Sequence, residues 1–241
     1  MLKPETERVW AFLKEQPALM GFVLLGGSAL ALHLHHRFSE DLDFAFLAER
    51  LPRPRLDALQ RAAAESRLDF EANDDPTAQH EFDNGGLDLR DYQQDFLVNR
   101  IVKVSFFTPD RPLLAVLEHQ SESRGPRLAS LGELFNSKSL LTASRSKTRD
   151  WFDLYVLMRT CGYSMANYHE AFGLAGVPDQ AAGGLQRLCA GKPQASDEGF
   201  AQLTSNPPSV EEMQGFFRAE RDRFERSEAA QARRKQQRSD H

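Results

Sequence analysis

The sequence is poor in the features that mark secreted and membrane proteins. Its 241 residues include two cysteines, Cys161 and Cys189, which form neither a disulfide framework nor a zinc-binding pattern. No apolar run approaches the ~20 residues of a membrane-spanning helix. Residues 1–20 carry charges throughout, which argues against a signal peptide. We therefore expect a protein of the reducing cytoplasm that has no membrane segment.

An overall positive charge is missing as well. The formal net charge is −5 and the isoelectric point is near 5.8. This excludes a basic field over the whole surface, so any RNA binding would need a local patch. The chain shows no internal repeat, and its length allows one or two domains. Its 41% of apolar residues is enough to bury a sizeable core.

The most informative stretch is residues 22–46, FVLLGGSALALHLHHRFSEDLDFAF. The apolar run 22–25 predicts a short strand, and residues 29–37 have the composition of a helix. A second strand follows, which begins at the Asp-x-Asp of residues 41–43. The stretch therefore predicts the order strand, glycine turn, helix, strand.

The Asp-x-Asp supplies candidate metal ligands. Side chains alternate along a strand, so Asp41 and Asp43 point to the same face. Two adjacent carboxylates repel each other unless a positive charge lies between them. Oxygen ligands suit Mg²⁺ or Mn²⁺. The alternative is an incidental surface pair, which is less favoured because the two acids open an apolar strand.

The glycine turn supplies a candidate phosphate-binding site. Gly26 and Gly27 allow the backbone to approach a phosphate, and a helix N-terminus offers free N–H groups. Ser28 is a candidate N-cap, and we expect its hydroxyl to contact a phosphate as well. A glycine turn and paired acids around one helix are the parts of a site for metal-assisted phosphoryl or nucleotidyl transfer.

A second group of charged residues lies further along the chain. Helical spacing puts Asp150 and Asp153 on neighbouring turns of one face. One of them is a candidate general base for an incoming hydroxyl, and the choice between them stays open. The alternative is that they are first-turn acids favoured by the helix dipole and paired with nearby arginines. The upstream Asp-x-Asp favours the functional interpretation.

Cations surround these two acids in the sequence. Arg145, Lys147 and Arg149 immediately precede or flank them, and Lys138 lies on a helix predicted from residue 131 to about 143. Guanidinium groups suit a triphosphate because they donate two hydrogen bonds at once. We therefore treat the cluster as candidate substrate-binding residues.

The remaining pattern predicts further strands and helices. Strands are expected around 79–83, 86–91, 94–98 and 101–107, and helices at 4–15, 55–67, 164–174, 179–190, 197–203 and 209–228. Asn99-Arg100 is a predicted hairpin turn. In the strand 101–107, the alternation puts Lys103 and Ser105 on one face, which carries no acid. Lys103 either faces the site or is a solvated strand lysine.

The two groups of residues together resemble a known family. Gly26-Gly27-Ser28 and the Asp-x-Asp resemble the nucleotidyltransferase (polymerase β-like) superfamily. The stretch GGSALALHLHHRFSEDLDF is similar to the AbiEii/AbiGii toxins of that superfamily. The pattern R-x-K-x-R-D-x-x-D-L at 145–154, after a helix lysine, resembles the second half of the family's pattern. His36-Arg37 is similar to the end of the family's Gly-His-Arg, with His35 in place of the glycine.

The resemblance implies an α+β fold, with a nucleotidyltransferase-type mixed sheet flanked by helices over residues 1–125. A mainly helical domain over 126–241 would carry the second half of the active site and end in a basic tail. Of the second group, the resemblance implicates Lys138 and Asp150. Arg37 would reach the phosphates or neutralise Asp41. The strand 101–107 departs from many superfamily members, which place a third metal-binding carboxylate there.

The resemblance also implies a function. It is metal-dependent transfer of a nucleotide from an NTP to an acceptor hydroxyl, such as a tRNA 3′ end, by the toxin of a toxin–antitoxin pair. An antitoxin protein would then be a partner. Two alternatives remain at this point. One is a non-catalytic module that binds NTP and metal, motivated by the absent third carboxylate, and the other is a kinase-like phosphotransferase of the same superfamily.

Overall fold

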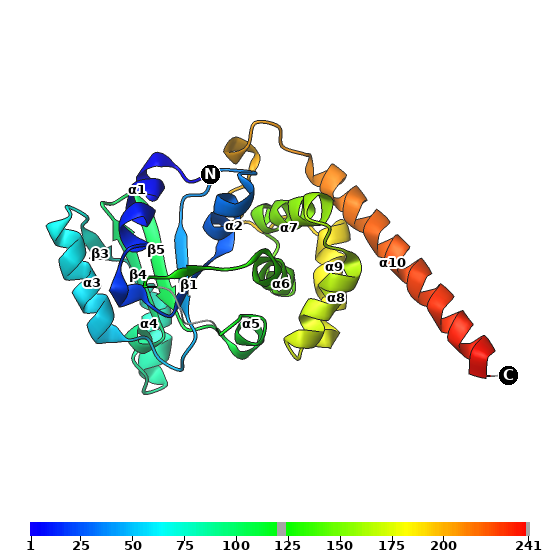
Figure 1. Ribbon diagram of the computed structural model, residues 1–241, viewed down its shortest axis with the longest axis horizontal. Helices are drawn as coiled ribbons and strands as arrows, with labels where there is room; N and C mark the ends of the chain where they lie inside the picture. Colours follow the sequence, from blue (N-terminus) through cyan, green and yellow to red (C-terminus); the bar gives the residue numbers. More distant parts are fainter. Residues whose placement is uncertain (120–123, 240–241) are drawn as a thin grey trace. The chain divides into compact units, whose positions relative to one another are not determined.

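The computed structural model describes residues 1–119 and 124–239, with side chains through residue 237 (Figure 1). The chain forms two compact units, residues 1–134 and 135–241. Each unit is described separately below as the first and the second unit. The division into functional domains after residue 125 stays a prediction.

The first unit is built on a mixed sheet. Within the described residues the sheet has six strands in the order β3-β4-β5-β2-β1-β6. Their bounds are β1 Phe22–Leu25, β2 Leu42–Phe46, β3 Phe70–Ala72, β4 Gln93–Val98, β5 Val102–Phe107 and β6 Arg127–Leu128. The β2–β5 and β1–β6 pairs are parallel and the other three are antiparallel. This mixed sheet confirms the predicted fold class.

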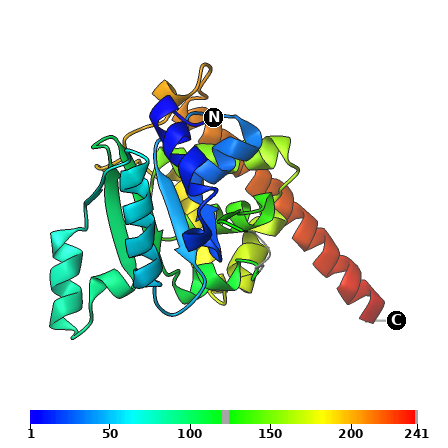
Figure 2. The same cartoon turned by 60° about the vertical axis from the view of Figure 1, so that its left-hand side comes forward.

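Helices accompany the sheet in the first unit. Their bounds are α1 Pro4–Leu13, α2 Gly26–Leu34, α3 Arg53–Glu65, α4 Pro76–Asn84 and α5 Arg111–Ala115, with 3₁₀ helices at Pro17–Leu19 and Leu89–Asp91. Helix α6, Leu131–Leu141, contains the boundary between the units. Figure 2 shows α1 and α3 lying along the sheet.

One face of the sheet carries an aromatic core. The rings of Phe44 and Phe106 stack with centroids 5.4 Å apart, and Phe22 packs on Phe106 edge to face at 5.6 Å. The ring centroid of Trp10 in α1 lies 6.3 Å from that of Phe44. Because strand side chains alternate, the residues next to these phenylalanines point to the opposite face. Asp43 and Ser105, which neighbour Phe44 and Phe106, therefore lie on that opposite face.

Two predicted strands are wrong. Residues 79–83 lie within helix α4, and residues 86–91 end in a 3₁₀ helix. The side chain of Asp75 caps α4 by accepting the N–H of Thr77 at 2.9 Å, and Pro76 occupies the first turn. This local start signal favours a helix over a strand. The strand β3 was not predicted.

The neighbouring hairpin follows the prediction. Strands β4 and β5 correspond to the expected strands 94–98 and 101–107. Asn99 and Arg100 between them have φ of 50° and 58°. Two consecutive residues with positive φ are typical of the tight turns that join antiparallel strands.

The second unit is helical, as expected. Besides the end of α6, it contains α7 Thr148–Thr160, α8 Met165–Leu174, α9 Ala181–Ala190 and α10 Val210–Ser239, with 3₁₀ helices at Pro178–Gln180 and Ala201–Leu203. Trp151 and Leu154 of α7 are fully buried, as are Met213 and Phe217 of α10. The helix predicted at 197–203 is reduced to the second of these 3₁₀ helices.

The predicted basic tail is part of a helix. Helix α10 continues to Ser239 and includes Arg233, Arg234 and Lys235. The side chain of Arg238, a further basic residue near the C-terminus, lies outside the described residues. Across residues 1–119 and 124–239, we find no helix long and apolar enough to cross a membrane.

Candidate active site

The glycine turn brings Asp43 against the start of α2. Gly26 is the first residue of the helix and has φ of +70°, a conformation that side-chain-bearing residues rarely adopt. A Cβ atom on Gly26 would lie 2.7 Å from Oδ2 of Asp43. The position therefore needs glycine twice, for its backbone conformation and for the approach of the carboxylate.

Gly27 makes room for Arg37. A Cβ atom on Gly27 would collide with a terminal nitrogen of the Arg37 guanidinium. Arg37 is 3% exposed, and its Nη1 donates to the carbonyl of Phe38 at 3.0 Å. A buried guanidinium thus lies directly against the glycine turn.

Ser28 plays a different local role from the one expected. The N-cap of α2 is Leu25, so Ser28 lies inside the first turn and its prediction as N-cap is wrong. Its hydroxyl is buried, donates to the backbone carbonyl of Asp41 and also contacts Oγ of Ser39 at 3.0 Å. Ser28 therefore ties α2 to the segment that leads into β2, which fixes the position of Asp41.

Asp41 and Asp43 provide two oxygen donors at the start of β2. Asp41 is exposed just before the strand, and Asp43 is half-buried within it. No group of three or more acids, histidines or cysteines able to hold a metal ion occurs among the residues that the structure describes. Two carboxylates fit a hard cation such as Mg²⁺ or Mn²⁺ whose other ligands are substrate oxygens and water.

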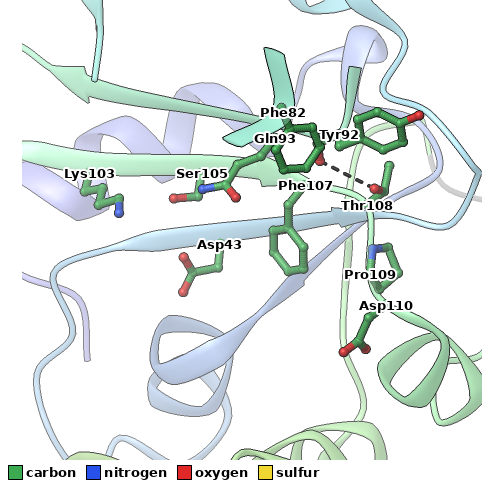
Figure 3. Close-up of a pocket in the computed structure, with 10 residues that line it drawn as sticks. All are labelled: Asp43, Phe82, Tyr92, Gln93, Lys103, Ser105, Phe107, Thr108, Pro109 and Asp110. Carbon is green, nitrogen blue, oxygen red and sulfur yellow. Dashed lines mark hydrogen bonds between the residues drawn. The ribbon is translucent and has the colours of Figure 1, made fainter. Parts of the chain in front are cut away.

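A cavity of about 500 Å³ opens beside Asp43, wholly within the first unit. It is lined by residues of β2, β4 and β5, by one residue of α4, by Tyr92 and by the loop after β5 (Figure 3). The lining residues are Asp43, Phe82, Tyr92, Gln93, Lys103, Ser105, Phe107, Thr108, Pro109 and Asp110. The cavity is large enough for a small-molecule substrate.

The strand register aligns three polar residues on the cavity face. Asp43 of β2 pairs with Ser105 of β5, and Ser105 pairs with Asp95 of β4. Lys103, two residues before Ser105, shares this face, lines the cavity and lies 3.3 Å from Oδ2 of Asp95. Lys103 therefore faces the candidate site. Asp95 was not predicted as a residue near the site, because strand pairing between distant segments is not visible in local sequence patterns.

The second unit contains a buried ion cluster. Nζ of Lys138 lies 2.6 Å from Oδ1 of Asp150 and 2.8 Å from Oδ2 of Asp153. All three residues are at most 4% exposed. Nε of Arg145 donates to Oδ2 of Asp150 at 2.7 Å. The side chain of Arg145 is partly exposed. Both acids therefore bind cations within their own unit.

The electrostatics of this cluster favour an ionised Asp150. Burial raises the pKa of its carboxyl, but Lys138 and Arg145 outweigh burial and hold the pKa below its ordinary value. A carboxylate with a depressed pKa that already accepts two charged donors is a weak base. The geometry thus favours Asp150 as a residue that positions Lys138 and Arg145.

The other two cations of the predicted cluster belong to the start of α7. Lys147 is the N-cap residue of α7. Arg149 turns to the segment before Phe200, where its Nε donates to the carbonyl of Gly199 at 2.8 Å and Nη1 lies 3.1 Å from Glu198. In the second unit, the structure therefore groups Lys138, Arg145, Asp150 and Asp153, whereas Arg149 contacts a different segment.

Comparisons with known proteins agree with this fold. The chain is similar to JHP933 from Helicobacter pylori (17% identity, 98% of this chain and 100% of that chain covered, TM-score 0.50). It is also similar to MenT4, a nucleotidyltransferase toxin from Mycobacterium tuberculosis H37Rv (13% identity, 88% and 82% covered, TM-score 0.52). At these identities the likeness concerns the fold alone. No curated protein is matched significantly.

The fold and the Gly-Gly-Ser and Asp-x-Asp segments define the class as a nucleotidyltransferase. The model of a family described as "Nucleotidyl transferase AbiEii toxin, Type IV TA system" matches residues 11–237. The match spans nearly the whole chain, and the protein belongs to this family of toxin nucleotidyltransferases. The sequence-based assignment to the family is therefore confirmed.

Proposed function

We propose that this nucleotidyltransferase uses a divalent cation, Mg²⁺ or Mn²⁺, held by Asp41 and Asp43, to transfer a nucleotide from an NTP to an acceptor hydroxyl. The observation that carries the proposal is the position of the Asp43 carboxylate. It lies against Gly26 at the first turn of α2 and lines the cavity. The cation, when bound, neutralises phosphate charge and stabilises the developing charge of the transfer.

The chain's own residues prepare this chemistry. Gly26 and Gly27 form the N-terminus of α2, whose N–H groups suit phosphate oxygens, and Asp43 and Arg37 lie against these two glycines. Ser28 holds the backbone of Asp41 through its hydroxyl, which ties the start of α2 to the segment that leads into β2. The buried Arg37 adds positive charge behind the turn. In-line attack by the acceptor hydroxyl on the α-phosphorus would form the new ester bond and release pyrophosphate.

The second unit is assigned a supporting role in this proposal. The resemblance implicates Lys138 and Asp150 in catalysis, and the buried pairing favours a positioning role for both, with Asp153 completing the charge balance. Arg145, half-exposed, keeps part of its guanidinium available to a phosphate. Lys147 and Arg149 remain candidate phosphate-binding residues.

The acceptor and the partner are proposed from the family alone. As a member of a type IV toxin–antitoxin family, the chain would act with an antitoxin protein. A tRNA 3′ end is the proposed acceptor, because it offers a free hydroxyl to a nucleotidyltransferase.

The experiment follows the fate of the phosphates. Purified protein is incubated with Mg²⁺ or Mn²⁺, total tRNA and each NTP in turn, labelled at either the α- or the γ-phosphate. Nucleotidyl transfer predicts an α-labelled acceptor and released pyrophosphate. An acceptor labelled only from the γ-phosphate would replace this proposal with a phosphotransferase. NTP-dependent thermal stabilisation without pyrophosphate release, with every acceptor tried, would count against transfer.

A further inference from the structure

The cavity beside Asp43 changes in chemical character along its length. Lys103, Ser105 and Asp43 lie toward one end, and Phe82 and Tyr92 lie farther from Lys103, as does Asp110 (Figure 3). A nucleotide has the same polarity, since its phosphates are charged and its base presents an apolar π-face. The cavity therefore matches a whole nucleotide better than it matches a bare phosphate.

Lys103 is held at the charged end by a buried acid. Asp95 is 4% exposed, and its Oδ2 accepts a hydrogen bond from Nε2 of Gln93 at 3.1 Å and pairs with Nζ of Lys103 at 3.3 Å. In the described part of the chain, Oδ1 of Asp95 has no hydrogen-bond partner. A buried carboxylate needs a nearby cation, so Asp95 restrains Lys103 on the cavity wall. An ammonium carries three donors, which leaves capacity for a phosphate oxygen.

A lysine at position 103 would help to balance the negative charge of a bound triphosphate. A triphosphate carries more negative charge than one divalent cation neutralises, and many transfer sites use a second ion for the remainder. Strand β5 presents Lys103 and Ser105 to the cavity instead of a further carboxylate ligand. A fixed lysine beside Asp43 supplies positive charge without a second ion.

The aromatic end offers a surface for the base. The rings of Phe82 from α4 and of Tyr92, just after the 3₁₀ helix, have centroids 5.5 Å apart at 45°. Both side chains are half-buried, so part of each ring faces the cavity. Aromatic side chains stack on bases with little preference among them, because every base has a π-face.

We propose that Lys103, held by Asp95, binds the phosphates of the nucleotide, and that Phe82 and Tyr92 stack on its base. The inference rests on the proposed function, because it assumes that an NTP occupies the cavity beside Asp43. It adds a phosphate-binding lysine and a base-binding surface to the residues already assigned.

Binding measurements without metal test the two parts separately. Calorimetry in excess EDTA measures the affinity of the full chain for inorganic tripolyphosphate and for each NTP. Lys103→Met should weaken both by about tenfold or more, the loss expected for one hydrogen bond to a charged group. Lys14→Met is the matched control, since the side chain of Lys14 is similarly exposed, 48% against 45% for Lys103. Lys103→Gln serves if the methionine variant fails to fold.

Alanine substitutions test whether Phe82 and Tyr92 bind the base. Phe82→Ala and Tyr92→Ala should weaken NTP binding by about tenfold and leave tripolyphosphate binding unchanged, because stacking involves only the base. Phe12→Ala, at a half-buried aromatic of α1 outside the cavity, should change neither affinity.

The outcomes separate this inference from the proposed function. Wild-type affinity for tripolyphosphate in both Lys103 variants would overturn the role of Lys103. Wild-type NTP affinity in both aromatic variants would overturn the base-binding surface. In either case NTP binding by the wild type with Mg²⁺ would leave the proposed function standing. Failure of the wild type to bind any NTP with Mg²⁺ would overturn both.

Discussion

The carboxylate of Asp43 lies so close to Gly26 that a single added methyl group at the glycine would stand 2.7 Å from Oδ2 of the acid. Gly26→Ala should therefore displace Asp43 and strain a backbone with φ of +70°. We expect nucleotidyl transfer to fall at least tenfold and the free energy of unfolding to drop by about 1–3 kcal/mol. Activity assays and urea unfolding measure the two effects.

Gly86 provides the control for this substitution. It also has φ of +70°, but a Cβ atom there would meet nothing within 4 Å. Gly86→Ala should carry the backbone strain alone and retain activity. Equal activity in the two variants would show that contact with Asp43 does not matter.

Lys138 neutralises two buried acids, so its removal should destabilise the second unit. Lys138→Met leaves Asp150 and Asp153 in a buried environment without their shared cation. Breaking a buried pair from one side typically costs about 3–5 kcal/mol. Chemical denaturation measures this, with Lys192→Met as a control at an exposed lysine of the same unit. A Lys138→Met variant as stable as the control would contradict the structural importance of the cluster.

The depressed pKa of Asp150 predicts how stability depends on pH. In the unfolded chain the carboxyl of Asp150 has a pKa near its ordinary value of 3.8. In the folded chain its pKa is lower, so the carboxyl binds a proton only at lower pH. Stability from this group is therefore complete above that value and is lost as pH falls through the folded pKa. The free energy of unfolding should decline more steeply below about pH 4 in the wild type than in Asp150→Asn. If the free energy of unfolding fell in parallel for the two proteins as the pH is lowered, protonation of Asp150 would not be the cause of the loss.

His35 occupies a backbone conformation suited to glycine. It ends α2 with φ of 51°, at the position where the family pattern resembled by this chain has Gly. The side chain is exposed. We expect His35→Gly to be about 1 kcal/mol more stable than His35→Ala, because only glycine avoids the left-handed penalty. Thermal unfolding of the pair measures the difference, and a more stable alanine variant would refute the explanation.

Local signals predicted the part of the fold around the glycine turn. The apolar runs of β1 and β2, the glycines between them and the Asp-x-Asp all act within a few residues, so their pattern is visible in sequence. Helix α4 was mistaken for a strand although Asp75 and Pro76 carried a helix-start signal. Residues 79–83 (QHEFD) are polar apart from Phe82, so no alternating apolar pattern supported a strand against that signal.

The polar face of the sheet was harder to foresee. Asp95, Ser105 and Asp43 lie in register across three strands, and this register depends on the pairing of Asp43 with Ser105, about 60 residues further along the chain. Alternation in one strand identified the face that Lys103 shares with Ser105. It did not identify Asp95 as the buried partner of that lysine.

Asp43 is proposed to serve metal-dependent nucleotidyl transfer. The most direct measurement incubates wild type and Asp43→Ala with α-labelled NTPs, total tRNA and either Mg²⁺ or EDTA, after unfolding curves have verified that the variant is folded. Removing one of two repelling carboxylates should leave stability unchanged or raised. We predict a labelled RNA only in the reaction that contains both the wild-type protein and Mg²⁺. Equal labelling by the folded Asp43→Ala variant would contradict the role of Asp43, and labelling undiminished in EDTA would contradict the need for a metal ion.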